Sequence, residues 1–421
     1  MWSNPGFADA ATILKDGLAV DRAQLYTPTL DPGLRPRTGA FDAPGTMFDR
    51  NGARPGRVLQ WNFSLQRELM KGLAIEAAYV GNRSSWLNQN NLANPNAISD
   101  QTLAANGLSR DRPADLVVLA SRIDSAAAAQ RGIVKPYASF PNTGTVAQSL
   151  RPVPQFNSAL TPRWAPLGNS WYDSLQVKVT KRYSHGLDFS AAFTFAKELS
   201  TNGANGDVFN RAALKGLTGG GIPVIFVTGF NYEVPAFGAN RFVKGLVGGW
   251  TVGGVLRYQS GTLIGVPTSN NNLNAHTFQS TRMERVEGQP LYLKDLNCHC
   301  IDPYKDLVLN PAAWRDVPQG KWGPSTPFYN DFRNTRRPDE QFSVGRRFNM
   351  AKVREGMSLQ FRAEMFNAFN RTYLANPGGA PNNATTFDNQ GRLTGGFGRI
   401  DPTSTGGGLP RNGQLVGRFQ W

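Results

Sequence analysis

The chain is poor in charged residues, and positive charge outweighs negative charge. Asp, Glu, Lys and Arg make up only 18% of its 421 residues, below the ~25% that is usual for soluble domains. Lys and Arg number 45 against 30 Asp and Glu, which gives a formal net charge of +15. The basic residues are scattered, and no zinc-finger, helix-turn-helix or RNA-recognition pattern accompanies them. Nucleic acid is therefore not expected as a partner.

Long hydrophobic runs are absent. No stretch approaches the ~20 consecutive apolar residues of a membrane helix, and the least polar stretch, 216–230, is short and rich in glycine. Any segment that crosses a membrane must therefore be a strand, since only helices and closed barrels satisfy their backbone groups in lipid. Residues 1–5 lack the charged and apolar regions of an export signal. We therefore expect the chain to be the tail of a longer protein.

Cysteine and histidine are scarce, with two and three copies, so a disulfide framework is excluded. One group, Cys298-His299-Cys300, has the ligand types that zinc prefers, but a structural zinc site normally needs four ligands. The only other histidines are His185 and His276, and His185 falls in an expected turn on the opposite side from this loop. A loop disulfide or free thiols fit better, so no metal site and no cofactor are assigned.

Signals of catalysis are also missing. No Ser/His/Asp or Cys/His constellation appears with supporting context, and no glycine-rich phosphate loop follows a strand and opens a helix. The 45 glycines and 28 prolines are spread over turns and loops. We assign no catalytic residue and do not expect an enzyme.

The chain is rich in period-two alternation, which is typical of strands because successive side chains point to opposite faces. The clearest case is 187–196, where Phe189, Phe193 and Phe195 share a face that a helix would scatter. Strands are expected at 59–68, 73–79, 171–180, 187–196, 222–234, 250–259, 341–348, 357–365 and 413–421.

The last strand ends on an aromatic residue. Leu415, Gly417, Phe419 and Trp421 share one face, and no polar tail follows, whereas the termini of soluble domains usually fray. An apolar face with an aromatic end suits a transmembrane barrel, where aromatic girdles lie at both interfaces.

Short and long connections alternate between the expected strands. The links near residues 70, 183, 240 and 353 are short or moderate, whereas 82–169, 198–221, 268–340 and 370–412 are long. This order is typical of outer-membrane barrels with short periplasmic turns and long extracellular loops, while ordinary domains have loops of ~4–6 residues. We predict an all-β fold, an antiparallel transmembrane β-barrel segment of about nine to ten strands; single-chain bacterial barrels have an even number, so we expect it to be incomplete.

Two regions follow from this pattern. Residues 1–56 are expected to be an extracellular, loop-like N-terminal segment, and 57–421 the barrel part, with 82–169 and 268–340 as long extracellular loops. Weak helical character is expected around 116–129 in the first of these loops.

Several segments in order resemble the late barrel of Oar-like TonB-dependent receptors, many of which carry an N-terminal carboxypeptidase-regulatory-like domain. The matching segments are 61–68, 78–83, 169–176, 181–187, 248–250, 259–262, 310–313, 361–367 and 397–400, followed by the aromatic terminus. The resemblance implies a barrel of about 22 strands with an N-terminal plug, energised through TonB. The signal, the TonB-contacting box, the plug and the early strands are not found in this chain.

Two sets of side chains have expected roles. Trp171, Trp250, Tyr258 and Phe348 are expected to be interfacial anchors rather than ligand stackers. Arg257, Arg362 and Glu364 lie on the polar face as lumen-facing candidates. They could contact a solute, but a solvated wall or contact with a plug is the favoured interpretation.

The expected function is solute uptake across the bacterial outer membrane by the barrel portion of a TonB-dependent receptor. Its partners would be outer-membrane lipid, the missing plug and early strands, the TonB complex through the missing N-terminal part, and an unidentified solute. The alternatives are a self-contained small porin-like barrel, with an undetected strand in 1–56, and a soluble β-rich binding or adhesion protein.

Overall fold

The computed structural model describes residues 38–41, 47–52, 54–201, 203–235, 247–350, 354–404, 406, 408 and 410–421. Most of the N-terminal segment 1–56 and parts of the links near residues 240 and 353 therefore lie outside the described residues.

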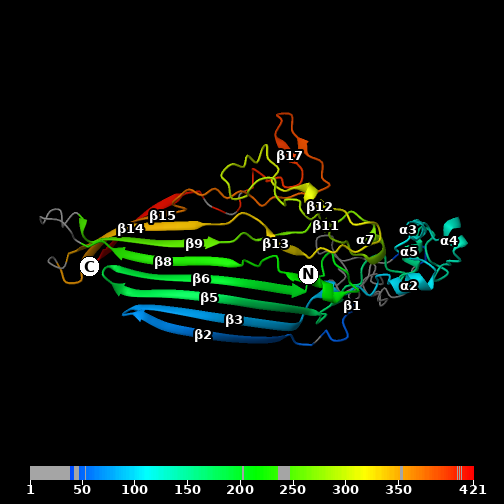
Figure 1. The fold of residues 1–421 in the computed structure, drawn as a ribbon, viewed down its shortest axis with the longest axis horizontal. Coiled ribbons are helices and arrows are strands. Elements are labelled where there is room, and N and C mark those ends of the chain that lie inside the picture. The colour runs from blue at the N-terminus through cyan, green and yellow to red at the C-terminus, as the bar shows by residue number, and fades with distance from the viewer. Residues whose placement is uncertain are drawn as a thin grey trace, which may run out of the picture.

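One large antiparallel sheet dominates the structure (Figure 1). Its order is β18-β15-β14-β9-β8-β6-β5-β3-β2, and the short β7 (Lys215–Leu217) also pairs with β6. The nine long strands are β2 (Arg57–Met70), β3 (Leu73–Leu87), β5 (Gly168–Ser184), β6 (Leu187–Thr201), β8 (Val224–Glu233), β9 (Trp250–Gln259), β14 (Asp339–Asn349), β15 (Ser358–Phe366) and β18 (Asn412–Gln420). All nine strands expected from alternation are present, and the predicted fold class is confirmed.

Several strands are longer than predicted. The expectation was about nine to eleven residues, but β5 has 17 residues and β3 and β6 have 15 each. The ladder continues past the alternating segment, as the pairing of Ser85 with Asn169 shows. Polar residues at the strand ends hide this extension from a pattern search.

The connections sort to opposite ends of the sheet. Lys71-Gly72 and His185-Gly186 close the β2–β3 and β5–β6 hairpins at what we call the short-link end, on the left of Figure 1. The long connections gather at the other end, the loop end. Gly186 has φ +79°, and a Cβ there would meet the Glu233 carbonyl oxygen at 2.5 Å, so this turn requires glycine.

The long connections carry small elements that alternation did not predict. They contain η2 (Asn90–Leu92), α2 (Asp100–Ala105), α3 (Pro113–Ala120), α4 (Ala126–Gln130), α5 (Val146–Ser149), η3 (Arg211–Leu214), α7 (Leu273–Thr277) and η4 (Pro311–Ala313). Two-stranded sheets join β1 (Met47–Phe48) with β4 (Pro162–Arg163), β10 (Leu263–Gly265) with β13 (Phe328–Arg333), β11 (Glu284–Arg285) with β12 (Trp314–Arg315), and β16 (Thr386–Phe387) with β17 (Leu393–Gly395). Within the described ranges, no helix has the length and apolar character needed to span a bilayer.

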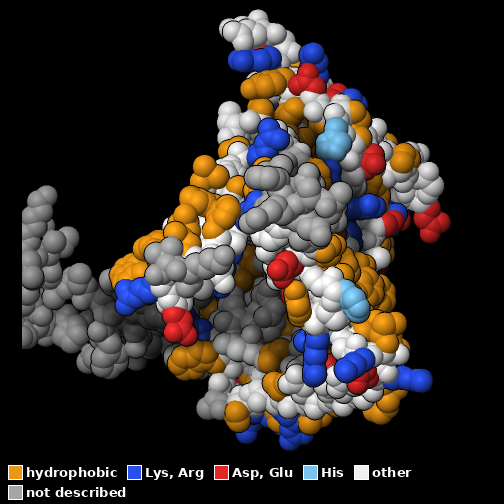
Figure 2. Space-filling model, turned by 90° about the vertical axis from the view of Figure 1, so that its left-hand side faces the viewer, with side chains coloured by type: hydrophobic (Ala, Val, Ile, Leu, Met, Phe, Trp, Pro, Cys, Tyr) orange, Lys and Arg blue, Asp and Glu red, His pale blue; other side chains and the backbone are white. Residues whose placement is uncertain are grey.

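The hydrophobic cores lie in the loops rather than on the sheet. One core packs α2–α5 around Leu119 and Phe140, and a second packs the β9–β14 and β15–β18 connections around Phe332 and Leu309. Among the described residues of the nine long strands, Ala78 is the only buried apolar side chain. The space-filling view onto the short-link end shows hydrophobic side chains along the outer margin of the molecule (Figure 2). Among the described residues, the segment 368–371 folds over the apolar side of β14 at one end, whereas many large apolar side chains elsewhere on the sheet are exposed.

Candidate functional site

The pairing register gathers the apolar side chains of the sheet onto one side, which we call the apolar face. One row across the strands consists of Leu65, Ala77, Val177, Phe193 and Phe226. Many residues of this face are exposed, including Phe63 at 65%, Leu65 at 66% and Leu415 at 87%. Exposure of so many large apolar side chains in a continuous patch marks an interaction surface.

The opposite side, which we call the polar face, carries hydrophilic groups in the same register. Gln66, Glu76 and Lys178 form one row across β2, β3 and β5. Since a strand alternates between two faces, this sheet separates an apolar surrounding from a polar one.

Two of the lumen-facing candidates contact each other on the polar face. Arg362 forms an ion pair with Glu364 on β15, and Gln414 of β18 donates to the Glu364 carboxylate. These side chains already have partners, which agrees with a wall role. Whether they face a lumen stays a prediction.

Arg257 lies in a different place, at the loop end of the polar face. It is exposed, and Asp339 is its register partner across the β9–β14 ladder. A cavity of about 620 Å³ opens here between β9, β14 and the β15–β18 connection. Its lining consists of Arg257, Gln259, Arg337, Asp339, Gln341, Phe366, Asn367, Tyr373, Gly406, Gly408, Pro410 and Asn412.

This cavity combines two guanidinium groups with one carboxylate. Gln341 donates to Asp339 at 3.2 Å, which orients that carboxylate. Burial, together with the charges of Asp339 and Glu340, raises the pKa of Tyr373. Because Arg257 and Arg337 stand against the single carboxylate of Asp339, the cavity has an excess of positive charge. Such a cavity suits a solute that carries a carboxylate or phosphate. Sequence reasoning identified Arg257 by alternation but missed Arg337 and Tyr373, because they lie outside the alternating strands.

The predicted interfacial aromatics lie at the two ends of the sheet. Trp171 and Tyr258 are near the loop end, where Tyr258 stacks on Phe226 with centroids 6.4 Å apart. Trp250 and Phe348 are at the short-link end, and Arg346 lies over both rings. The terminal residues Leu415, Gly417 and Phe419 lie in β18, and Trp421 follows directly and stacks on Phe419. Their placement at a membrane interface stays a prediction.

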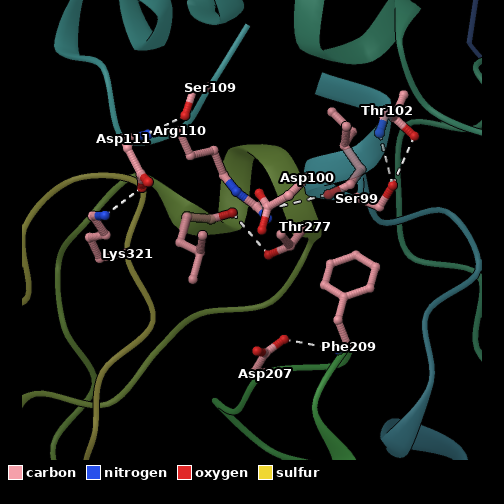
Figure 3. A network of polar contacts seen from close by, with 12 residues as sticks. Ser99, Asp100, Thr102, Ser109, Arg110, Asp111, Asp207, Phe209, Thr277 and Lys321 are labelled. Carbon is pink, nitrogen blue, oxygen red and sulfur yellow. Dashed lines mark hydrogen bonds and ion pairs between the residues drawn. The ribbon is translucent and has the colours of Figure 1, made fainter. Parts of the chain in front are cut away.

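Polar contacts join the β3–β5 connection, which contains α2–α5, to the β9–β14 connection (Figure 3). We call this contact region the junction. Arg110 pairs with Asp100 at the start of α2, and Lys321 pairs with Asp111. Arg151 donates to the carbonyl oxygens of Ala275 at 2.6 Å and His276 at 3.1 Å. Burial lowers the pKa of Arg151 to about 9.

His276 is buried in this junction, at 1% exposure, and neither ring nitrogen has a hydrogen-bond partner among the described residues. Burial lowers the pKa of His276 to about 4, and the charges of Arg110 and Arg151 act in the same direction. The junction therefore accommodates the neutral imidazole and disfavours the imidazolium.

Cys298 and Cys300 form a disulfide within the β9–β14 connection. Of the readings left open by the sequence, the structure has the loop disulfide. No group of His, Cys, Asp and Glu in the described residues is arranged to hold a metal ion.

The antiparallel sheet has one exposed apolar face and one polar face, and its hydrophobic cores lie in the loops. These features are typical of a protein that crosses a membrane with strands. The family model described as "Outer membrane beta barrel domain" matches residues 2–414. The chain belongs to this family, and its location is the bacterial outer membrane.

Solved structures with similarity include Pseudomonas aeruginosa FpvA bound to heterologous pyoverdines, at 10% identity and a TM-score of 0.34 over 91% of this chain and 29% of that one. The outer membrane transporter YddB from Escherichia coli is 9% identical, with a TM-score of 0.32 over 91% and 34% of the two chains. A Pseudomonas aeruginosa FadL homologue is 10% identical, with a TM-score of 0.17 over 86% and 67%. The chain thus spans about a third or less of the first two proteins. No curated protein matches the chain.

Proposed function

We propose that the chain is the C-terminal barrel portion of an Oar-like TonB-dependent receptor, which takes up a solute across the outer membrane. The observation that carries this proposal is the exposed apolar face of a sheet whose other face is polar. In a barrel wall the apolar face contacts lipid and the polar face lines the lumen.

The open edges of the sheet support the portion of the proposal that concerns further strands. Within the described residues, β2 pairs only with β3, and β18 pairs only with β15. A sheet edge in hydrocarbon leaves backbone groups without partners, at a cost of several kcal/mol for each group. Further strands are therefore expected to complete the barrel.

In this proposal the loop end is extracellular and the short-link end is periplasmic. The cavity at Arg257 and Arg337 lies at the loop end of the polar face, so it is placed to contact solute that enters the lumen. The wall is passive and performs no catalysis; a plug outside this chain opens the path when TonB acts on it.

Cysteine labelling tests the orientation. Ala105→Cys places a thiol on exposed α2 at the loop end, and Lys71→Cys places one in the exposed β2–β3 link. The native cysteines are joined in a disulfide and do not react with a maleimide. Membrane-impermeant maleimide on intact cells should label residue 105, and residue 71 only after the outer membrane is permeabilised; the reverse pattern contradicts the orientation.

The coding sequence upstream of Met1 tests the larger protein. An in-frame plug and export signal support the receptor. A stop codon and a promoter directly upstream contradict it and favour the self-contained porin-like barrel.

A further inference from the structure

The loop end of the apolar face carries positive charges that do not line the cavity at Arg257 and Arg337. Arg83 of β3, Lys197 of β6 and Lys215 of β7 lie on this face by register, and we call them the cationic cluster. One carboxylate, Asp173 of β5, lies among them, in the same row as Lys197.

Arg83 neutralises that carboxylate. Its Nη2 donates to both Asp173 oxygens, at 3.1 and 3.0 Å, and its Nη1 donates to the Tyr172 carbonyl oxygen at 3.1 Å. Tyr79 also donates to Asp173, at 2.6 Å. Lys197 is also a cross-strand neighbour of Asp173. Among the described residues, Arg83, Lys197 and Lys215 set three positive charges against this one carboxylate in this part of the face, which leaves an excess of positive charge.

The two lysines are available to a ligand. Both side chains are exposed, and Lys197 makes no hydrogen bond or ion pair with the described residues. The Lys215 ammonium group lies 4.0 Å from the centroid of the Trp171 ring. An ammonium group held over an aromatic ring stays close to the sheet surface.

A cavity of about 760 Å³ adjoins both lysines, between β6, β7 and β13. Its apolar wall includes Phe195, Leu199 and Leu217, which share the apolar face with Lys197. The lining also contains Glu198 and Arg333, so three basic groups stand against one acid. A cavity that is apolar on one side and has two ammonium groups beside it matches an amphiphile with a negatively charged head. A soluble anion would leave the apolar wall uncovered, and a neutral lipid would leave the lysines unused.

The position along the strand agrees with a lipid headgroup. Lys181, at the short-link end, follows Asp173 by eight residues on β5, which corresponds to about 26 Å along the strand. The apolar band of outer-membrane barrels is about 25 Å tall, so the cationic cluster lies near one boundary of the hydrocarbon. On β9 and β14 the loop-end positions are Tyr258 and Glu340, and Glu340 is paired with Arg371, so positive charge is not in excess there.

We propose that this cavity and the cationic cluster bind a lipid with a phosphate headgroup, with the phosphate at Lys197 and Lys215 and an acyl chain along Phe195 and Leu217. Placement of this lipid in the outer leaflet rests on the orientation proposed above. The binding itself does not depend on transport.

Native mass spectrometry of the complete protein, purified in detergent from outer membranes, tests the proposal. Bisphosphoryl lipid A is the probe, and its dephosphorylated form and inorganic phosphate are the competitors. A lysine near a charged lipid surface contributes about 1 kcal/mol, or about fivefold in affinity, so Lys197→Gln with Lys215→Gln should weaken binding by roughly 30-fold. Lys197→Arg with Lys215→Arg should retain it.

Lys178→Gln is the matched control, because Lys178 is exposed on the polar face of neighbouring β5. This variant should bind the probe as the parent does. Equal binding by the double Gln variant, equal competition by the dephosphorylated lipid, or full competition by inorganic phosphate each overturns the proposal. Maleimide labelling reports the orientation separately, so a failure of lipid binding is distinguishable from a failure of the proposed function.

Discussion

The carboxylate of Glu340 lies 2.9 Å from the guanidinium group of Arg371, and Glu340 is completely buried although it occupies the apolar face of β14. Arg371 comes from the connection after β15, and Ala368 of the same segment donates its backbone N–H to the Glu340 carbonyl oxygen at 2.9 Å. A loop therefore folds over the sheet at the loop end and supplies the charge that a buried carboxylate needs.

Removal of one partner from this pair should be costly. Arg371→Ala leaves the Glu340 carboxylate buried without a counter-ion, which typically costs 3–5 kcal/mol, somewhat less here because Arg371 is about one-third exposed. Replacement of both residues, Glu340→Leu with Arg371→Leu, should be much less destabilising. Urea unfolding of the protein in detergent measures both; an equal loss in the two variants contradicts the ion-pair argument.

The assignment of the two faces predicts opposite effects at adjacent residues. Phe193 is on the apolar face in the middle of β6, and Thr194 is on the polar face. Phe193→Arg should reduce stability by about 2–4 kcal/mol, because it places a charge in hydrocarbon, whereas Thr194→Arg should be tolerated. The fraction of heat-modifiable folded protein in outer membranes measures this difference. A better yield for Phe193→Arg means that the faces are reversed.

Close packing on the β2–β3 hairpin gives a second pair of substitutions. A Cβ at Gly81 would lie 2.4–2.6 Å from the Trp61 ring, while one at Gly417 would meet nothing closer than 3.9 Å. Gly81→Ala should displace the indole and cost about 1–3 kcal/mol, the usual range for overpacking. Gly417→Ala is the control and should leave stability unchanged. Tryptophan fluorescence during unfolding follows both, and an unshifted Gly81→Ala curve contradicts the packing argument.

The sheet was predictable from the sequence, and the loop architecture was not. Alternation located β6 because Phe189, Phe193 and Phe195 all fall on alternate positions of one face, along a strand with two different surroundings. It also placed Arg257 on the polar face. The cavity lined by Arg257 was missed because Arg337 and Tyr373 come from connections without a periodic pattern, and they meet Arg257 only in the folded chain.

The same limit applies to charged groups on the apolar face. Glu340 and Arg371 are separated by 31 residues, and neither has a sequence signal that names the other as its partner. Arg83 and Asp173 are brought together by the β3–β5 ladder across a connection that includes α2–α5. Patterning specifies which face a strand residue occupies, whereas ion pairs between distant strands and loops depend on register and loop closure.

Because His276 is buried in the junction between the long connections, we predict that the stability of this junction decreases in acid. Its pKa is lowered from an ordinary 6.5 to about 4 in the folded protein, first by burial and then by Arg110 and Arg151. Because the unfolded junction binds a proton more readily, stability is complete above pH 6.5 and falls as the pH decreases toward 4. The full shift corresponds to about 3 kcal/mol.

Hydrogen exchange of residues 94–111 and 270–283 at pH 7, 5.5 and 4.5 measures this loss. The parent should exchange faster as the pH falls, after correction for intrinsic rates, and His276→Gln should lose most of that dependence because its side chain does not titrate. His185→Gln, in the β5–β6 turn, is the control and should behave as the parent does. Protonation of His276 favours opening of the junction because the imidazolium would otherwise be buried beside two guanidinium groups. An identical pH dependence in His276→Gln and the parent would show that other groups control the junction.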